Sequence, residues 1–278
     1  MTNKINILFV MAVIVSGLSC SSISSEGRKT SSVGDGKQLF LSHPLDGKKV
    51  EFFINKPISQ KPLKTIIFVH GHQSTNPNGG YDFVKWKVLN KWRQRGFLAV
   101  AISQPGYGGS EGMPDFCGMY TQDAIIAVKK HLVQQQLADS DNITLLGISR
   151  GAMISGMVAA RDRDIKNLVL IGGAYDLEAL YKELPDGPLK RNIKREGGAE
   201  SYQFRERSVL AHGEKIKART LILHGKTDRR PTFKNAKELY EMLKISNVEV
   251  EFHPFESGHR IPVKERNVFI DKFLLGVP

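Results

Sequence analysis

Residues 142–160 decide the fold, and they read Asn-Ile-Thr-Leu-Leu-Gly-Ile-Ser-Arg-Gly-Ala-Met-Ile-Ser-Gly-Met-Val-Ala-Ala. The branched apolar residues at the start predict a buried strand, and the small residues at the end predict a helix. Between them, Gly147-Ile148-Ser149-Arg150-Gly151 predicts a sharp turn that exposes the Ser149 hydroxyl above the strand. Gly147 and Gly151 suit this turn because they have no Cβ to collide with neighbouring chain. The alternative is an ordinary glycine-rich turn from strand to helix.

The rest of the chain repeats this alternation of strand and helix. We expect strands at 65–69, 97–102, 143–146, 168–171, 220–223 and 248–252, and helices at 81–95, 120–136, 152–161, 234–244 and 263–275. This order predicts an α/β fold with a mainly parallel central sheet and helices on both faces.

Two departures from this alternation are expected. The runs 37–45 and 48–55 are joined by Asp46-Gly47, which predicts an antiparallel hairpin at the start of the sheet. Residues 176–214 are polar and irregular, and they predict a small lid.

Length and composition limit the class of protein. The chain has 278 residues, of which 41% are hydrophobic and 24% charged, as in soluble globular proteins. One large α/β domain over residues 37–278 accounts for this length. Two cysteines exclude a disulfide scaffold and a four-cysteine zinc module. The net charge of +12 favours loose attraction to anionic surfaces.

The first residues have the pattern of an export signal. Lys4 precedes a run from Ile5 to Val15 that is apolar except for Asn6, too short for a membrane span and typical of a signal peptide. Residues 1–19 are therefore predicted to be a signal peptide, and the alternative is a buried N-terminal strand. Residues 20–36 are predicted to be a flexible, serine-rich tether.

A lipid anchor is a further expectation for this segment. Gly17-Leu18-Ser19-Cys20 resembles a bacterial lipoprotein processing box, which would make Cys20 the lipid-bearing N-terminus, although the usual Leu three residues before the Cys is Gly17. Ordinary cleavage near Ser19 is the alternative. We expect the protein to be periplasmic or at the cell surface, with no nucleic acid as partner. Lipidation of Cys20 would anchor it to a bacterial membrane as a lipoprotein.

A serine hydroxyl needs a general base that is itself held by an acid before it becomes a good nucleophile. In α/β folds of this kind the acid and then the histidine follow the serine along the chain. His259 lies between the last expected strand and the last helix, and it is the candidate base. Asp228 follows the strand at 220–223 and is the preferred acid. Asp176 is the alternative acid, although capping of a following helix explains it more simply.

A developing oxyanion would need two backbone donors. We expect them to be the N–H groups of Arg150, directly after the serine, and of His72, in the loop after the strand at 65–69. The alternative for His70 and His72 is a pair of metal ligands. No cysteine or carboxylate pair accompanies them, so we expect no metal and no cofactor.

These residues carry a resemblance to a known family. The turn at Ser149, the His70-Gly71 loop, the loop 104–110 and Asp123 resemble α/β-hydrolases. Residues 207–259 resemble more closely the catalytic domain of the prolyl oligopeptidase family, with dienelactone-hydrolase-like esterases as near relatives. The resemblance implies Ser149, Asp228 and His259 as a catalytic triad.

Departures from the family affect the expected substrate. The loop at 70–74 is His-Gly-His-Gln-Ser and lacks the glycine- and proline-rich form usual in these peptidases, and no acidic pair for a free amino terminus is evident. The length is also short for a propeller plus a catalytic domain. We therefore expect a serine hydrolase that cleaves small carboxylic esters through an acyl-serine. A peptidase acting on short peptides and a catalytically silent binding protein are the alternatives.

Overall fold

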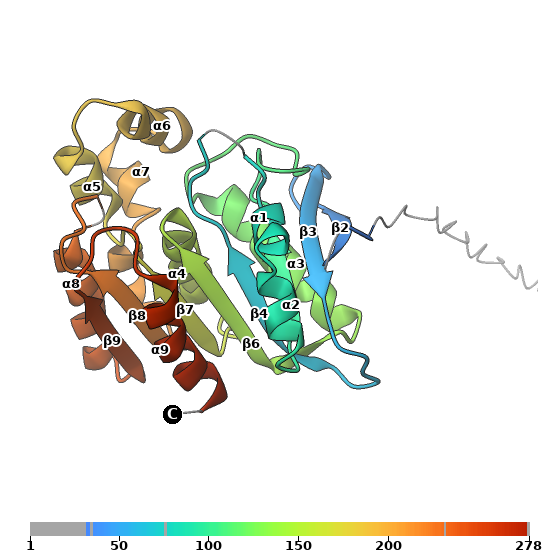
Figure 1. The fold of residues 1–278 in the computed structure, drawn as a ribbon. Helices are drawn as coiled ribbons and strands as arrows, with labels where there is room; N and C mark the ends of the chain where they lie inside the picture. Colours follow the sequence, from blue (N-terminus) through green and yellow to red (C-terminus); the bar gives the residue numbers. More distant parts are fainter. Residues whose placement is uncertain (1–31, 34–35, 75–76, 231, 277–278) are drawn as a thin grey trace, which may run out of the picture.

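The computed structural model of the chain describes residues 32–33, 36–74, 77–230 and 232–276. These residues form one nine-stranded sheet in the order β1-β2-β3-β5-β4-β6-β7-β8-β9 (Figure 1). Its strands are β1 (Ser32–Val33), β2 (Gly36–Ser42), β3 (Lys49–Asn55), β4 (Leu63–Val69), β5 (Leu98–Ile102), β6 (Ala138–Ile148), β7 (Asn167–Ile171), β8 (Arg219–Gly225) and β9 (Val250–Phe255).

The sheet is mainly parallel, as the sequence predicts. The first three strands pair antiparallel with one another, and β3 pairs antiparallel with β5. From β5 onwards in the sheet order, each strand pairs parallel with the next one. Because parallel strands end at the same edge, the loops after β4, β6, β7, β8 and β9 come together beyond their carboxyl ends.

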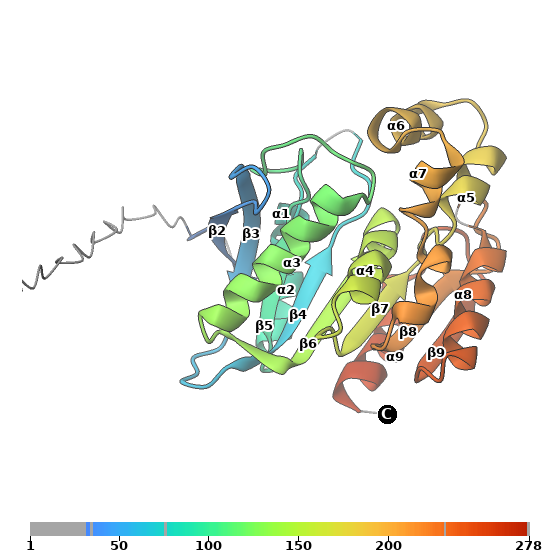
Figure 2. The same ribbon diagram turned by 180° about the vertical axis from the view of Figure 1, so that it is seen from behind.

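Helices cover both faces of the sheet (Figures 1 and 2). One core packs the sheet against α3 (Met119–Gln134), α4 (Arg150–Arg161) and α8 (Phe233–Ile245). The other core packs the opposite face against α1 (Tyr81–Lys85), α2 (Val88–Arg93) and α9 (Val263–Leu275). Strands such as β5, whose residues are all buried, are apolar throughout because both of their faces are covered. Among the helices described, none combines the length and apolar character needed to cross a bilayer.

The segment 176–214, which we call the cap, differs from the irregular structure that the sequence predicts. It contains the helices α5 (Leu177–Glu183), α6 (Pro188–Gly197) and α7 (Ser201–Arg205), and two short 3₁₀ turns (Val209–Ala211 and Gly213–Lys215). The cap helices lie beyond the carboxyl edge of the sheet (Figure 1). Isolated buried side chains fix them, among them Leu177, Ile193 and Phe204. Because each of these polar helices has few buried apolar residues, the sequence shows little helical periodicity of apolar residues in this segment.

The single helix predicted at 81–95 is also wrong, because α1 and α2 are separate. Lys87 lies between them in the left-handed region, with φ of 57°. The break lets Phe83 in α1 and Trp92 in α2 both pack on the sheet, while Trp86 stays 61% exposed.

The N-terminal predictions are only partly within the described residues. The expected tether extends to residue 36, but Ser32–Val33 and Gly36–Lys37 pair as strands. The predicted signal peptide and Cys20 lie outside the described residues.

Candidate active site

Ser149 stands at the turn between β6 and α4 in a strained conformation. Its φ is 56° and its ψ is −120°, and its N–H donates to the carbonyl of Ile171 at 2.8 Å. A Cβ at Gly147 would overlap the carbonyl of Gly151, and a Cβ at Gly151 would overlap the carbonyl of Val69. Only glycines therefore fit on either side of this turn, which holds the serine hydroxyl above the sheet.

The structure brings Ser149, His259 and Asp228 into one hydrogen-bonded line. The His259 Nε2 atom lies 3.0 Å from the Ser149 Oγ, and the His259 Nδ1 lies 2.8 Å from the Asp228 Oδ2. A carboxylate can only accept, so Nδ1 carries the proton and Nε2 is left to accept from the serine hydroxyl. The Asp228 side chain is 1% exposed, and its second oxygen accepts the N–H of Arg230 at 3.1 Å.

Backbone hydrogen bonds hold the acid and the histidine together. The loop after β8 donates from Lys226 N to Phe255 O at 2.8 Å, and from Thr227 N to Ser257 O at 3.1 Å. These bonds extend the pairing of β8 with β9 to the loop that carries His259. The distance between His259 and Asp228 is thus set by two neighbouring strands.

Asp176 is not in contact with His259. It is the N-cap of α5, and its Oδ1 accepts from the N–H of Ala179 at 3.0 Å. Its role in the structure is the capping role that the sequence offers as the simpler explanation.

The two residues expected to supply the oxyanion donors, Arg150 and His72, line the same cleft as Ser149. Arg150 is the first residue of α4, where N–H groups have no partner within the helix. The loop with His72 packs closely on the turn, since a Cβ at Gly71 would lie 3.0 Å from the Ile148 carbonyl. Burial and the nearby Arg150 and Arg195 lower the pKa of His72 to about 4, so its imidazole is neutral at pH 7.

His70 is a structural residue in this loop. Its Nδ1 is 2.8 Å from the Gly71 carbonyl, and its Nε2 accepts the N–H of Gln104 at 3.1 Å. Burial, with a contribution from Arg150, lowers the pKa of His70 to about 3. Both ring nitrogens of His70 have hydrogen-bond partners within the protein. Nowhere in the described chain do three or more His, Cys, Asp or Glu side chains group as a metal site.

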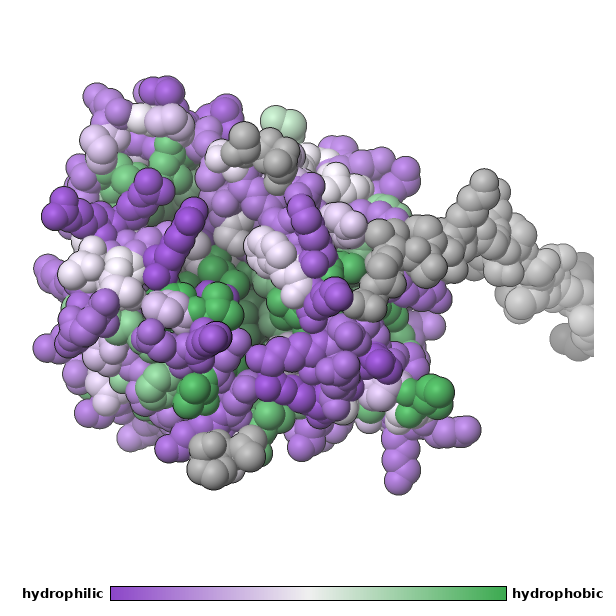
Figure 3. Space-filling model, viewed as in Figure 1, coloured by the Kyte–Doolittle hydropathy of each residue, from purple (hydrophilic) through white to green (hydrophobic). Residues whose placement is uncertain are grey.

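A cleft of about 540 Å³ opens above Ser149 and His259. In the space-filling view, the surface between the cap and α1 is hollowed and exposes apolar side chains (Figure 3). The apolar lining comes from both sides of the cleft: Phe83, Trp86, Phe116, Met153, Leu180 and Leu189. The tyrosines in and next to the cap are not among the residues that line the cleft. Tyr175 is buried in the core, Tyr181 packs against Phe204 with the two rings tilted, and Tyr202 is 63% exposed.

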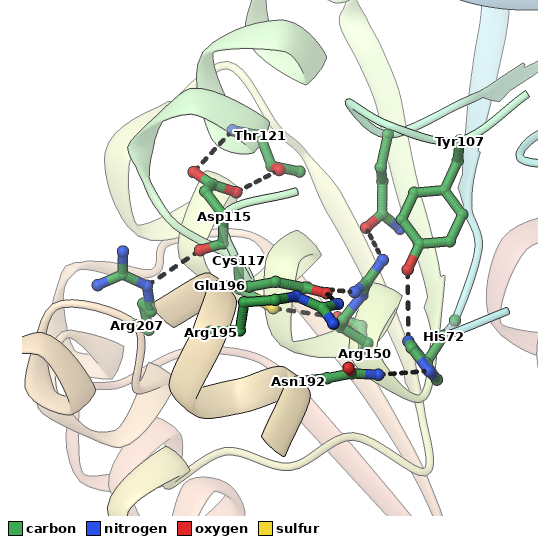
Figure 4. A network of polar contacts seen from close by, with 12 residues as sticks. His72, Tyr107, Asp115, Cys117, Thr121, Arg150, Asn192, Arg195, Glu196 and Arg207 are labelled. Atoms are coloured by element: carbon green, nitrogen blue, oxygen red, sulfur yellow. Dashed lines mark hydrogen bonds and ion pairs between the residues drawn. The ribbon is translucent and has the colours of Figure 1, made fainter. Parts of the chain in front are cut away.

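Sequence reasoning missed the side chains around Arg150. Its guanidinium is buried, donates to the Gln104 Oε1 at 3.0 Å and pairs with the Glu196 Oε2 at 3.3 Å (Figure 4). It also lies over the rings of Tyr107 and Phe116, with centroid distances of 4.7 and 5.6 Å. No sequence motif identifies Glu196, because a glutamate in a polar helix is normally expected to be exposed to solvent.

Comparison with known proteins places the chain in a family. The model of the prolyl oligopeptidase family matches residues 88–274. The chain is 32% identical over 184 residues to YtmA, an uncharacterized peptidase of Bacillus subtilis, and the match covers 63% of this chain and 69% of YtmA. It is 24% identical over 242 residues to acylamino-acid-releasing enzyme 2 of Oryza sativa, which covers 79% of this chain but 31% of that enzyme.

A solved structure has the same fold. The acylaminoacyl peptidase of Pyrococcus horikoshii superposes with a TM-score of 0.70 and 17% identity, over 87% of this chain and 42% of that one. The chain thus spans less than half the length of this peptidase and about a third of the plant enzyme. The extent of the family match and the identity to YtmA establish that the chain belongs to the prolyl oligopeptidase family of serine peptidases.

Proposed function

We propose that this chain is a serine peptidase that cleaves short peptides through an acyl intermediate on Ser149. The observation that carries the proposal is the line of hydrogen bonds from Ser149 through His259 to Asp228, of which Ser149 and His259 line the cleft. The sequence alone favours an esterase. The family membership and the peptidase relatives favour its alternative, a peptidase.

The steps follow from the geometry. His259 Nε2 takes the hydroxyl proton as the Ser149 Oγ bonds to the scissile carbonyl carbon, and the N–H groups of Arg150 and His72 stabilise the oxyanion. His259 then donates this proton to the leaving nitrogen as the C–N bond breaks. Water, activated by the same imidazole, hydrolyses the acyl-serine and releases the acid. Asp228 holds the His259 tautomer and stabilises the imidazolium.

The lining of the cleft suggests which peptides are bound. Among the described residues that line the cleft, the arginines are Arg150, Arg230 and Arg260 and the one carboxylate is Asp82, and the charge of Arg150 is paired with Glu196. The oxygens of Asp82 accept from the side-chain amides of Gln73 and Asn78 at 2.9 Å. A cationic cleft repels a free ammonium group, so we propose that the preferred substrates carry a blocked amino terminus and an apolar side chain.

Labelling and a matched substrate set test this proposal. A fluorophosphonate should modify Ser149, as mapped by mass spectrometry, and Ser149→Ala should lose both label and activity. The substrates are N-acetyl-alanine p-nitroanilide, alanine p-nitroanilide and p-nitrophenyl esters, compared by kcat/KM. We expect the acetylated anilide to be cleaved faster than the free amine. Efficient cleavage of the esters alone would favour an esterase over a peptidase. Absence of label on Ser149 would contradict a serine hydrolase.

We also propose that the enzyme is exported. The support is the apolar N-terminal run and Cys20 in the sequence. Cell fractionation and radiolabelled palmitate test this: the label should depend on Cys20 and be lost in Cys20→Ser. Export without label indicates ordinary cleavage, and a cytoplasmic product contradicts the proposal.

A further inference from the structure

Two residues on one face of α6 contact the two segments expected to form the oxyanion hole. Asn192 and Glu196 are four residues apart, so their side chains lie on the same side of the helix. Glu196 reaches Arg150 at the Ser149 turn, and Asn192 reaches His72 in the loop after β4 (Figure 4). These are the residues whose backbone N–H groups we assign to the oxyanion.

The contact with the turn is a buried ion pair. The side chains of Arg150 and Glu196 are each 4% exposed, and the distance between Nη1 and Oε2 is 3.3 Å. Arg195 also donates to Glu196, at 2.9 Å, from the exposed side of α6. A buried guanidinium that lost this carboxylate would be left with an uncompensated charge. The position of Glu196 therefore fixes the position of the Arg150 side chain.

The contact with the loop passes through the imidazole of His72. Its Nε2 lies 3.5 Å from the Asn192 Nδ2, and its Nδ1 lies 3.3 Å from the Tyr107 hydroxyl. Because the imidazole is neutral, it offers one donor and one acceptor, which suit two neutral polar partners. The side chain of His72 is thus fixed between the cap and the loop 104–110.

We propose that α6 positions the oxyanion hole, with Asn192 setting the His72 N–H and Glu196 setting the Arg150 N–H. This inference rests on the proposed peptidase function. The two residues do not touch the reacting atoms; they act through His72 and Arg150. Oxyanion donors stabilise the transition state more than the bound substrate, and they must be placed accurately to do so. Displacing them should therefore lower kcat and leave KM nearly unchanged.

Substitutions on the two sides of α6 test the proposal. Asn192→Ala and Glu196→Ala remove the inner contacts, while Glu196→Gln keeps an acceptor for Arg150 without the charge. Arg191→Ala and Lys194→Ala on the exposed side are the matched controls. Titration with the fluorophosphonate counts active sites, so that kcat is expressed per folded enzyme. We expect Asn192→Ala and Glu196→Ala to lower kcat roughly ten-fold or more with KM within about two-fold, and Glu196→Gln to restore most of the loss.

Inhibitor binding separates this role from a merely structural one. An N-acetylated peptide aldehyde places an oxyanion in the hole when it adds to Ser149, whereas the matching peptide alcohol does not. The inhibition constant of the aldehyde should rise by the same factor by which kcat/KM falls, and that of the alcohol should stay constant. His72→Ala keeps the backbone donor but loses the contact, so its effect and that of Asn192→Ala should not add in the double variant.

The outcomes distinguish the two proposals. Wild-type enzyme without label or activity would overturn the peptidase and this inference with it. Active wild type, with Asn192→Ala and Glu196→Ala folded and equal to the controls in kcat and aldehyde binding, would overturn the inference alone. If Glu196→Ala does not fold, Asn192→Ala decides the matter by the same comparison with the controls.

Discussion

Gly225, the last residue of β8, packs directly against the backbone carbonyl of Gly258, the residue before His259. A Cβ on Gly225 would overlap the carbonyls of both Ser257 and Gly258. The Ser257 carbonyl cannot move away without breaking its hydrogen bond from the N–H of Thr227. The missing side chain at Gly225 therefore determines how near His259 comes to Ser149.

Gly225→Ala should push the histidine loop away and lower kcat by roughly 10²-fold, the order expected when a reacting group is displaced by about 1 Å. Steady-state kinetics with active-site titration measure this. Gly258→Ala is the matched control, since a Cβ there would meet its nearest atom, the Thr227 Oγ1, only at 3.9 Å. Equal activity of the two variants would show that the contact at Gly225 does not position His259.

The two candidate acids should behave in opposite ways. Asp228→Asn should reduce kcat on the order of 10⁴-fold, because an amide at this place no longer holds the required His259 tautomer. Asp176→Ala should leave kcat near that of wild type and lower the free energy of unfolding by about 1 kcal/mol through loss of the α5 cap. Kinetics and urea unfolding measure the two effects. A loss of activity in Asp176→Ala with Asp228→Asn still active would reverse the assignment.

The stability of the protein should decrease in acid through His70. Its pKa is lowered to about 3 in the folded protein from an ordinary 6.5, so the unfolded chain binds one more proton between these values. The contribution of His70 to the free energy of unfolding is therefore fully present above pH 6.5, and it is lost as the pH decreases towards 3. From pH 5.5 to 4, the free energy of unfolding of wild type should fall more steeply than that of His70→Gln by about 1.4 kcal/mol per pH unit.

Urea unfolding at several pH values measures this difference. The range from pH 7.5 to 8.5 is the internal control, because His70 is neutral there in both states and the two slopes should agree. If the free energy of unfolding fell with equal slopes for wild type and His70→Gln in the acid range, His70 would also bind this proton in the folded protein.

Cys117 should be unreactive in the folded protein. It is 1% exposed next to Arg150, and burial raises the pKa of its thiol well above the ordinary value. Since the thiolate is the reactive form, iodoacetamide at pH 8 should modify Cys117 only after unfolding. Mass mapping of the Cys117 peptide with and without urea measures this. Rapid modification in the absence of urea would show that the segment around Phe116 and Cys117 opens readily.

Local sequence determined the strands and most helices of the body and the turn at Ser149, but not the break between α1 and α2. Apolar periodicity acts over a few residues, and Gly147 is required within the turn itself, where a Cβ would overlap the carbonyl of Gly151. The chain order of the elements also placed Asp228 and His259 in loops at the same edge of the sheet. These features depend on neighbours along the chain, so they can be read without a structure.

Only the tertiary structure decided which distant groups touch. His259 contacts a carboxylate 31 residues away and a hydroxyl 110 residues away, and Asp176, equally plausible by chain order, caps a helix instead. The cap helices and the pairing of Glu196 with Arg150 were likewise hidden, because a polar helix with one inward carboxylate has the same sequence pattern as a solvated one. Such contacts arise when the parallel strands bring their loops to one edge, and no segment taken by itself contains that information.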